Sequence, residues 1–95
     1  MSPEARERRG TGVEKMFYVY LIQSESDLSQ RYIGYTKDLK QRLFDHNSGK
    51  SKHTSKYMPW SLISYHTFAD EQKAREFEYY LKTGSGQAFA KKRFW

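Results

Sequence analysis

The chain has 95 residues, which suits one small domain, and its 17 Lys and Arg against 11 Asp and Glu give a formal net charge of +6. It has no cysteine, which excludes disulfides, thiolate zinc sites and cysteine nucleophiles. No segment has the roughly 18 apolar residues of a membrane span and the N-terminus is unlike a signal peptide, so we expect a cytoplasmic protein with no membrane partner.

The first 15 residues mix charges with two glycines and a proline and contain little apolar surface. Such a segment does not repay the entropy of ordering, so we predict a disordered tail at residues 1–15 and one functional domain at residues 16–95. Translation from Met16 instead of Met1 is a further hypothesis. The domain keeps an excess of basic residues, which favours a polyanionic partner over a merely soluble basic protein.

Residues 17–22 and 31–35 are rich in aromatic and β-branched side chains, and the polar residues between them predict a β-hairpin. A helix of about three turns is predicted next, with Thr36 as its N-cap, Asp38 in its first turn and an end near Gly49. Its expected apolar stripe is Leu39, Leu43 and Phe44. Arg42 and His46 are four residues apart, so they share one face of this helix.

A polar, basic loop is predicted at residues 48–58 and a third strand at residues 60–68. Strand alternation predicts Trp60, Leu62 and Phe68 on one face of this strand and Ile63 and Tyr65 on the other, which implies cover on both sides. Asp70 is the expected N-cap of a second helix that runs to about Lys82 and buries Ala74, Phe77 and Leu81. Residues 83–86 should break it, and residues 87–95 should form a short basic helix with Phe89 and Phe94 directed inward.

The hairpin carries two triplets, Tyr18-Val19-Tyr20 and Tyr32-Ile33-Gly34, and Arg42, His46-Asn47-Ser48-Gly49 and Glu78-x-x-Leu81-Lys82 follow them. This combination resembles the GIY-YIG nuclease family, in particular its small single-domain bacterial branch, over roughly residues 17–93. The resemblance implies an α/β (α+β) domain with a three-stranded antiparallel sheet flanked by helices, in the order β-β-α-β-α-α. Gly34 lacks a Cβ, so it should allow a close approach to its neighbours.

By the same resemblance, the catalytic residues are Tyr20, Tyr32, Arg42, His46 and Glu78. Glu78 is the expected ligand of Mg²⁺ or Mn²⁺, because a hard cation can be held by one carboxylate with waters around it. A surface ion pair between Glu78 and Lys82 is the alternative, and Glu76 is the rival ligand if the pattern is displaced by two residues.

The other four residues also have two interpretations. Arg42 is expected to clamp a phosphate with two parallel donors, although an ordinary surface arginine has the same spacing. Tyr32 is expected to activate or orient water and Tyr20 to orient the site, a role that needs a metal or Arg42 nearby because a phenol has a pKa near 10; packing within a hairpin is the alternative. His46 is expected to contact the phosphate or share proton transfer, or only to stabilise the helix end.

Seven basic residues are expected to contact nucleic acid: Lys50, Lys52, Lys56, Lys82, Lys91, Lys92 and Arg93. His53, Tyr57 and Trp60 lie among them and are candidate stacking surfaces, although core burial is the stronger expectation for Trp60. The chain departs from the family where Tyr18 replaces glycine and where no asparagine follows the metal-binding glutamate. Asn47 is its one asparagine, and Gln87 or Ser85 are the candidate substitutes.

The resemblance therefore implies a Mg²⁺-dependent endonuclease that hydrolyses DNA with little sequence specificity, in DNA repair or recombination. Branched, nicked or single-stranded DNA is the expected partner, and we expect a monomer. The alternatives are a nucleic-acid-binding module that has lost useful catalysis and a basic component of a ribonucleoprotein.

Overall fold

The computed structural model describes residues 15–95, so the predicted tail lies outside the described residues except for Lys15, and the proposed start at Met16 stays a hypothesis. The elements are β1 (Phe17–Ser24), β2 (Arg31–Thr36), α3 (Leu39–Asn47), the short 3₁₀ helix η2 (Ser55–Tyr57), β3 (Trp60–Phe68), α4 (Glu71–Leu81) and α5 (Gly84–Arg93). Apart from η2, this is the predicted order β-β-α-β-α-α, which is confirmed. Among the described residues, no helix is long and apolar enough to cross a bilayer.

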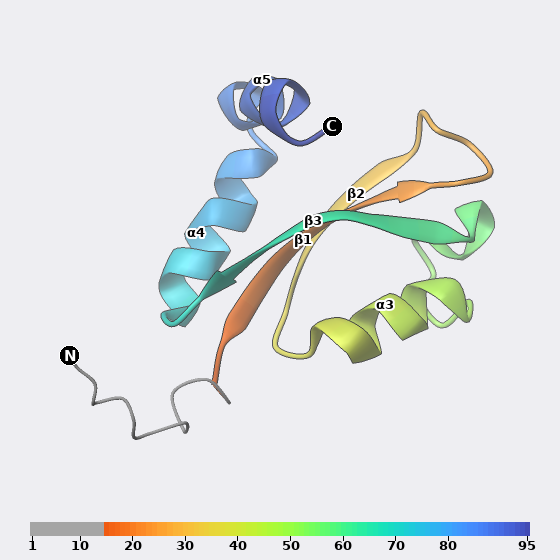
Figure 1. Cartoon of the computed structure of the whole chain (residues 1–95), viewed down its shortest axis with the longest axis horizontal. Coiled ribbons are helices and arrows are strands. Elements are labelled where there is room, and N and C mark those ends of the chain that lie inside the picture. The colour runs from red at the N-terminus through yellow and green to blue at the C-terminus, as the bar shows by residue number, and fades with distance from the viewer. Residues whose placement is uncertain (1–14) are drawn as a thin grey trace.

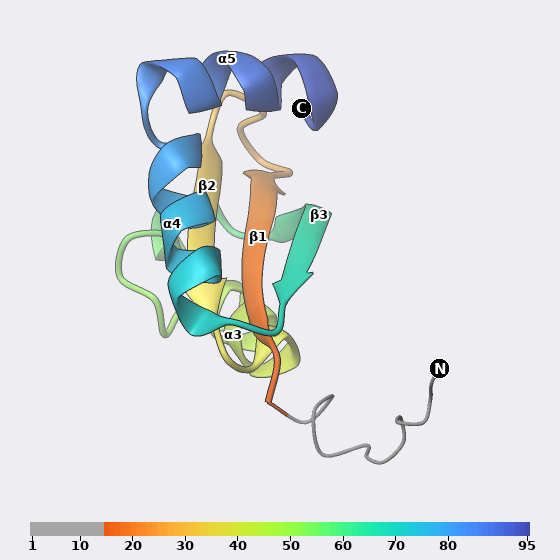
Figure 2. The same cartoon turned by 90° about the vertical axis from the view of Figure 1, so that its left-hand side faces the viewer.

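The three strands form one antiparallel sheet in the order β2-β1-β3, so β1 is central and both other strands are edges. α3 covers one face and α4 covers the other, while α5 crosses the end of the sheet (Figures 1 and 2). Each face has its own buried cluster. The α4-side core contains Val19, Leu21, Ala74, Leu81 and Ala90, and the α3-side core contains Tyr20, Ile22 and Trp60.

The strand β3 changes face along its length. Its pairing with β1 shifts register between Leu21 and Ile22, so Ile22 pairs with Leu62 while Leu21 pairs with Ser64. Such a bulge reverses the alternation of side chains beyond it. Trp60 consequently joins the α3-side core and Phe68 the α4-side core. The prediction that Trp60 and Phe68 share a face was wrong, whereas cover on both sides of the sheet is confirmed.

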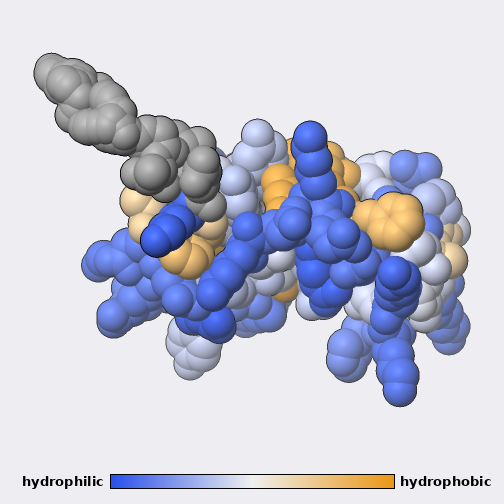
Figure 3. All heavy atoms as spheres, turned by 90° about the horizontal axis from the view of Figure 1, so that it is seen from below, coloured by the Kyte–Doolittle hydropathy of each residue, from blue (hydrophilic) through white to orange (hydrophobic). Residues whose placement is uncertain are grey.

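The first helix differs from its prediction at both its cap and its stripe. Asp38, not Thr36, is the N-cap, and its Oδ1 accepts from the backbone N–H of Gln41 at 3.1 Å. Thr36 ends β2 instead. Phe44 is 59% exposed, so the predicted stripe was wrong at this position. The buried side of α3 consists of Leu39, Leu43 and His46. Because His46 is polar, an apolar pattern in the sequence could not identify it as a buried position. The α3 side of the molecule is largely hydrophilic, with isolated apolar patches (Figure 3).

The second helix begins as predicted, because the carboxylate of Asp70 accepts from the N–H groups of Gln72 and Lys73. The third helix begins earlier than predicted. α4 ends at Leu81, just before the predicted break at residues 83–86, but Thr83 is already the N-cap of α5 and Gly84-Ser85-Gly86 is its first turn. Phe94 packs against the α4-side core as predicted. Phe89 is 38% exposed and contacts the rings of Tyr80 and Phe94, so its inward direction was wrong.

Candidate active site

Two tyrosines and a histidine from three elements meet beside the edge strand β2. The ring centroids of Tyr20 on β1 and Tyr32 on β2 are 6.2 Å apart. The imidazole of His46, near the end of α3, lies 5.6 Å from Tyr20 and 5.1 Å from Tyr32. Tyr20 pairs with Gly34 across the sheet, and a Cβ at Gly34 would collide with the Tyr20 ring. Because Gly34 has no Cβ, the Tyr20 ring can lie directly against its backbone.

Tyr20 begins a buried chain of hydrogen bonds. Its hydroxyl is 2.8 Å from His46 Nε2, and His46 Nδ1 is 2.6 Å from Thr54 Oγ1. Thr54 donates in turn to the carbonyl oxygen of Ser51 at 3.5 Å. Because the Ser51 carbonyl can only accept, the Thr54 hydroxyl donates to it, and the Thr54 oxygen accepts from His46 Nδ1–H. His46 Nε2 then carries no hydrogen and accepts from the Tyr20 hydroxyl. Tyr20, His46 and Thr54 are essentially inaccessible to solvent.

Burial fixes the charge state of this chain. Burial, and the nearby Tyr32, raise the pKa of Tyr20 far above its ordinary value, and the opposing effect of Arg42 is smaller. Burial and the charge of Arg42 lower the pKa of His46 to about 4. At neutral pH, Tyr20 is therefore a neutral phenol and His46 a neutral imidazole. The structure gives His46 a partner in Tyr20 instead of an exposed position facing a phosphate.

Arg42 stands one turn before His46, beside both tyrosines. Partial burial lowers the pKa of Arg42, but the hydroxyls of Tyr20 and Tyr32 outweigh it and raise that pKa above its ordinary value. Its side chain is 33% exposed, and its Nη1 is 3.9 Å from the carboxylate of Asp45. This long contact leaves the guanidinium as an accessible cation next to Tyr32.

Glu78 reaches the site from α4. Its side chain is 22% exposed, and its Oε2 accepts from Lys82 Nζ at 2.9 Å, so the i,i+4 ion pair foreseen as the alternative is present. Its charge also contributes to the raised pKa of Tyr20, behind burial and Tyr32, which puts Glu78 within electrostatic reach of Tyr20. The rival Glu76 is more exposed, at 55%, and is paired with Lys73 along α4.

The carboxylate of Glu78 has the chemistry that a hard cation needs. It is a half-buried oxygen donor, and Lys82 is its ion-pair partner. Among residues 15–95, no group of three or more His, Asp or Glu gathers to hold a metal ion. A cation held by Glu78 would therefore depend on water and substrate oxygens for its other ligands, and it would compete with Lys82 for Oε2.

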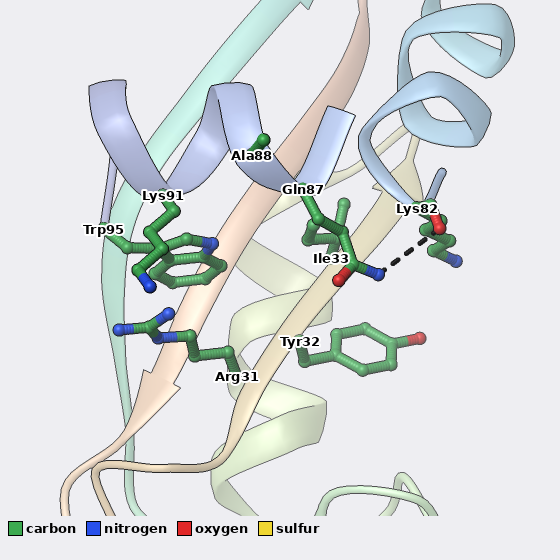
Figure 4. A pocket seen from close by; sticks show the side chains of 8 residues that line it. All are labelled: Arg31, Tyr32, Ile33, Lys82, Gln87, Ala88, Lys91 and Trp95. Carbon is green, nitrogen blue, oxygen red and sulfur yellow. Dashed lines mark hydrogen bonds between the residues drawn. The ribbon is translucent and has the colours of Figure 1, made fainter. Parts of the chain in front are cut away.

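A cavity of about 500 Å³ opens on the α5 side of Tyr32. Tyr32 and Arg31 form its floor from β2, Lys82 stands at one end, and Trp95 lies at the other below α5 (Figure 4). Tyr32 thus belongs both to the cluster around His46 and to this cavity. It is the more accessible of the two tyrosines, since it is half-buried while Tyr20 is fully buried.

The seven basic residues expected at the nucleic-acid surface are all exposed. Three lie in the loop between α3 and β3, which also carries Thr54, and four lie at the end of α4 and on α5. Trp60 is 5% exposed and donates its indole N–H to the carbonyl of Thr54 at 2.8 Å, so it belongs to the core and offers no stacking surface. Tyr57 packs against that core, and His53 is exposed.

Two structural contacts near the site were missed from the sequence. The Asn47 side chain donates to the backbone carbonyl of Trp60 at 3.1 Å and accepts from the backbone N–H of Trp60 at 2.6 Å. These two bonds connect the end of α3 to the start of β3. Thr54 closes the chain through His46. No spacing signal could have found either pair, because the loop between the partners has no regular period. Of the two candidates for the missing asparagine, Gln87 lines the cavity and Ser85 does not.

Comparison with known proteins gives one family. A model of the GIY-YIG catalytic domain matches residues 16–93. A UPF0213 protein of Bacillus pumilus (strain SAFR-032) is 45% identical over 53 residues, which are 55% of this chain and 54% of that protein. A UPF0213 protein of Streptococcus pneumoniae serotype 4 is 39% identical over 66 residues, which are 68% of this chain and 65% of that protein.

Among solved structures, a UPF0213 protein of Bacillus halodurans, determined in solution by NMR, is 28% identical with a TM-score of 0.48. That match covers 78% of this chain and 80% of the other. The matched segments span 54% and 65% of the lengths of the two sequence relatives above, between about half and two thirds of each.

Proposed function

The chain belongs to the GIY-YIG catalytic-domain family, and from that premise we propose that it is a metal-dependent endonuclease that hydrolyses phosphodiester bonds in DNA. The proposal is carried by Tyr32 and Arg42, which lie together at the β2 edge, and by Glu78 on α4, which lies within electrostatic reach of Tyr20. A basic residue, a phenol and a carboxylate at one accessible place can bind a phosphate and position a water beside it.

Arg42 is the proposed phosphate clamp. Its guanidinium keeps its charge at any working pH, and its partial exposure lets a phosphate oxygen approach. Two parallel N–H donors can neutralise charge that grows on the phosphate oxygens as water attacks. Since Asp45 is 3.9 Å away, its carboxylate can hold the guanidinium in position without occupying its donors fully.

Tyr32 is the proposed water-orienting residue and Tyr20 a positioning residue. The Tyr20 hydroxyl is committed to His46 and is fully buried, so it cannot touch a substrate. Its ring, held between Gly34 and His46, instead packs beside Tyr32 and Arg42 and keeps them in position. Tyr32 is accessible and lies beside Arg42, so its hydroxyl can hydrogen-bond and orient a water next to a phosphate that Arg42 binds.

Glu78 is the residue proposed to hold Mg²⁺ or Mn²⁺. When bound, such a cation neutralises phosphate charge and favours loss of the leaving oxygen. Lys82 would then be released from Glu78 and become free to contact a phosphate.

The cellular role we propose is DNA repair or recombination in the cytoplasm, carried out by a monomer. Low sequence specificity follows if the exposed basic residues contact the sugar-phosphate backbone, since backbone contacts carry no direct sequence information. Branched, nicked or single-stranded DNA is the proposed substrate.

The test is cleavage of plasmid and branched DNA with Mg²⁺ or Mn²⁺ by the wild type, Glu78→Ala and Glu76→Ala. Glu76→Ala is the matched control, because it removes the same group from the same helix outside the site. We expect cleavage that Glu78→Ala and a chelator abolish and Glu76→Ala retains, with all three proteins folded by circular dichroism. Equal activity of Glu78→Ala and wild type would refute the metal assignment.

The ion pair between Lys82 and Glu78 specifically favours a second candidate, a nucleic-acid-binding module without catalysis. In that case Glu78 only fixes Lys82 on the surface of α4. The same assay separates the two, since a binding module would bind DNA independently of metal and cleave none of the substrates.

A further inference from the structure

The mechanism above uses the cavity beside Tyr32 only through Tyr32 and Lys82. It measures about 500 Å³, within the range of pockets that hold small molecules. β2 forms one wall, the end of α4 a second, and α5 with the residues after it a third (Figure 4). Apart from Tyr32, none of the residues that give it its chemistry is among the proposed catalytic residues: Arg31, Lys82, Gln87, Lys91 and Trp95.

The lining combines positive charge with flat π surfaces. The guanidinium carbon of Arg31 lies over the Trp95 ring, 4.9 Å from its centroid, so the guanidinium is stacked on one face of the indole and the pair forms one stacking platform. Lys91 lies beside this platform, and Lys82 stands at the opposite end (Figure 4). Among the described residues that line the cavity, none is acidic. Flat rings with cations on both sides suit an aromatic base that carries phosphates.

The side chain of Gln87 extends from α5 toward Tyr32, between the two ends of the cavity (Figure 4). Its Nε2 donates to the carbonyl of Lys82 at 3.3 Å, which orients the carboxamide. The carboxamide oxygen is then available to accept a hydrogen bond. A base with an exocyclic amino group, which means adenine, cytosine or guanine but not thymine, can donate one.

We propose that this cavity is a nucleotide subsite that holds one unpaired base next to the phosphate bound by Arg42. The inference rests on the proposed function, since Tyr32 links the cavity to the phosphate site. The base stacks on the platform of Trp95 and Arg31 and bonds to Gln87, while Lys91 contacts its phosphate. A base inside a duplex is stacked and paired, so it can enter only after leaving the helix. The substrate must therefore offer an unpaired nucleotide at this position.

The experiment is equilibrium binding of fluorescein-labelled single-stranded oligonucleotides, followed by anisotropy in the presence of a chelator so that no cleavage occurs. One series carries a single abasic position, moved step by step along the strand. We expect one position at which loss of the base weakens binding roughly tenfold, the scale of one base stacked on an aromatic side chain. An adenine or cytosine at that position should bind more tightly than a thymine.

Three variants test which residues of the cavity contact the base and which contact the phosphate. Gln87→Ala and Trp95→Ala should weaken binding of the intact strand and leave binding of the abasic strand unchanged, because the lost contacts are with the base. Lys91→Ala should weaken both strands equally, because its contact is with phosphate. Lys73→Ala removes one charge from an exposed position on α4 outside the cavity and should do neither. Gln87 is exposed, so Gln87→Ala gives an answer even if Trp95→Ala is poorly folded.

The subsite is refuted if no single position in the abasic scan matters, or if Gln87→Ala weakens intact and abasic strands equally. These outcomes are independent of catalysis. If the protein cleaves DNA but its binding does not depend on the abasic position, the subsite is refuted and the nuclease function stands. If binding depends on the position but no DNA is cleaved with Mg²⁺, the subsite stands and the nuclease function is refuted.

Discussion

Tyr20 and Tyr32 are the same residue type 6.2 Å apart, yet their surroundings give them different properties. Tyr20 is fully buried with its hydroxyl on His46, while Tyr32 is half-buried and lines a cavity. Both were expected from the signature triplets. Which of them contacts water or substrate could not be predicted from the triplets alone, because that depends on the position of His46 after α3 has folded.

Tyr20→Phe and Tyr32→Phe should therefore separate stability from activity. Tyr20→Phe leaves His46 Nε2 buried without a donor, which should lower the free energy of unfolding by about 1–3 kcal/mol. Tyr32→Phe removes only the contact of its hydroxyl with the partly exposed Arg42, so its stability should stay within about 1 kcal/mol of the wild type while cleavage falls by at least roughly 100-fold. Urea unfolding and initial cleavage rates measure the two effects.

If Tyr32→Phe kept wild-type activity and Tyr20→Phe lost it without loss of stability, the assignment of the two tyrosines would be reversed. His46 would then accept a proton from the Tyr20 hydroxyl during the reaction, although burial favours the neutral form of both groups.

At the scale of elements, the junction of α4 and α5 is the part that the sequence misrepresented most. Glycines usually end helices, and two of them within residues 83–86 predicted a break; α4 does end at Leu81, but α5 begins at Gly84 instead of the predicted Gln87. Here Gly86 is buried in the first turn of α5, where a Cβ would lie 2.7 Å from Leu81 Cα and closer still to the carbonyl of Tyr80. It is therefore a packing glycine, needed because α5 lies directly against the end of α4.

Gly86→Ala and Gly84→Ala should consequently have different effects on stability. Gly86→Ala must push α5 away from the backbone of Tyr80, which should cost more than about 2 kcal/mol of stability and displace the cavity wall. A Cβ at Gly84 meets nothing within 4 Å, so Gly84→Ala should be neutral or stabilise by up to about 1 kcal/mol. Thermal unfolding of both proteins measures this; equal stabilities would show that the two helices do not pack this closely.

Other elements show why some features could be predicted and others not. Two strands with aromatic and β-branched residues predict a hairpin from local chemistry alone, and Asp70 predicts the start of α4 in the same way. The bulge in β3 is different, since it arises from pairing with β1, 40 or more residues earlier in the chain. One inserted residue was enough to move Phe68 to the opposite face.

At the scale of the whole molecule, the basic residues lie on both sides of the candidate site. The loop with Lys50, Lys52 and Lys56 is joined to the tyrosine cluster through Thr54 and His46. The second set adjoins the cavity at Lys82 and Lys91. A nucleic acid strand that passes Arg42 would therefore meet positive charge in both directions, which predicts binding that weakens steeply as salt rises.

The triple variant Lys50→Ala, Lys52→Ala, Lys56→Ala tests this arrangement. Each phosphate contact contributes about 0.9 to the slope of log K against log salt for duplex DNA, so loss of three contacts should reduce the slope by up to about 2.7. The matched control is Lys37→Ala, Lys40→Ala, Lys73→Ala, which removes the same charge from exposed positions away from the loop. Anisotropy titrations between about 50 and 200 mM salt give both slopes. Equal slopes for the two triple variants would mean that net charge alone drives binding; a larger reduction for the loop variant would place the strand along the loop that holds Thr54, next to Arg42.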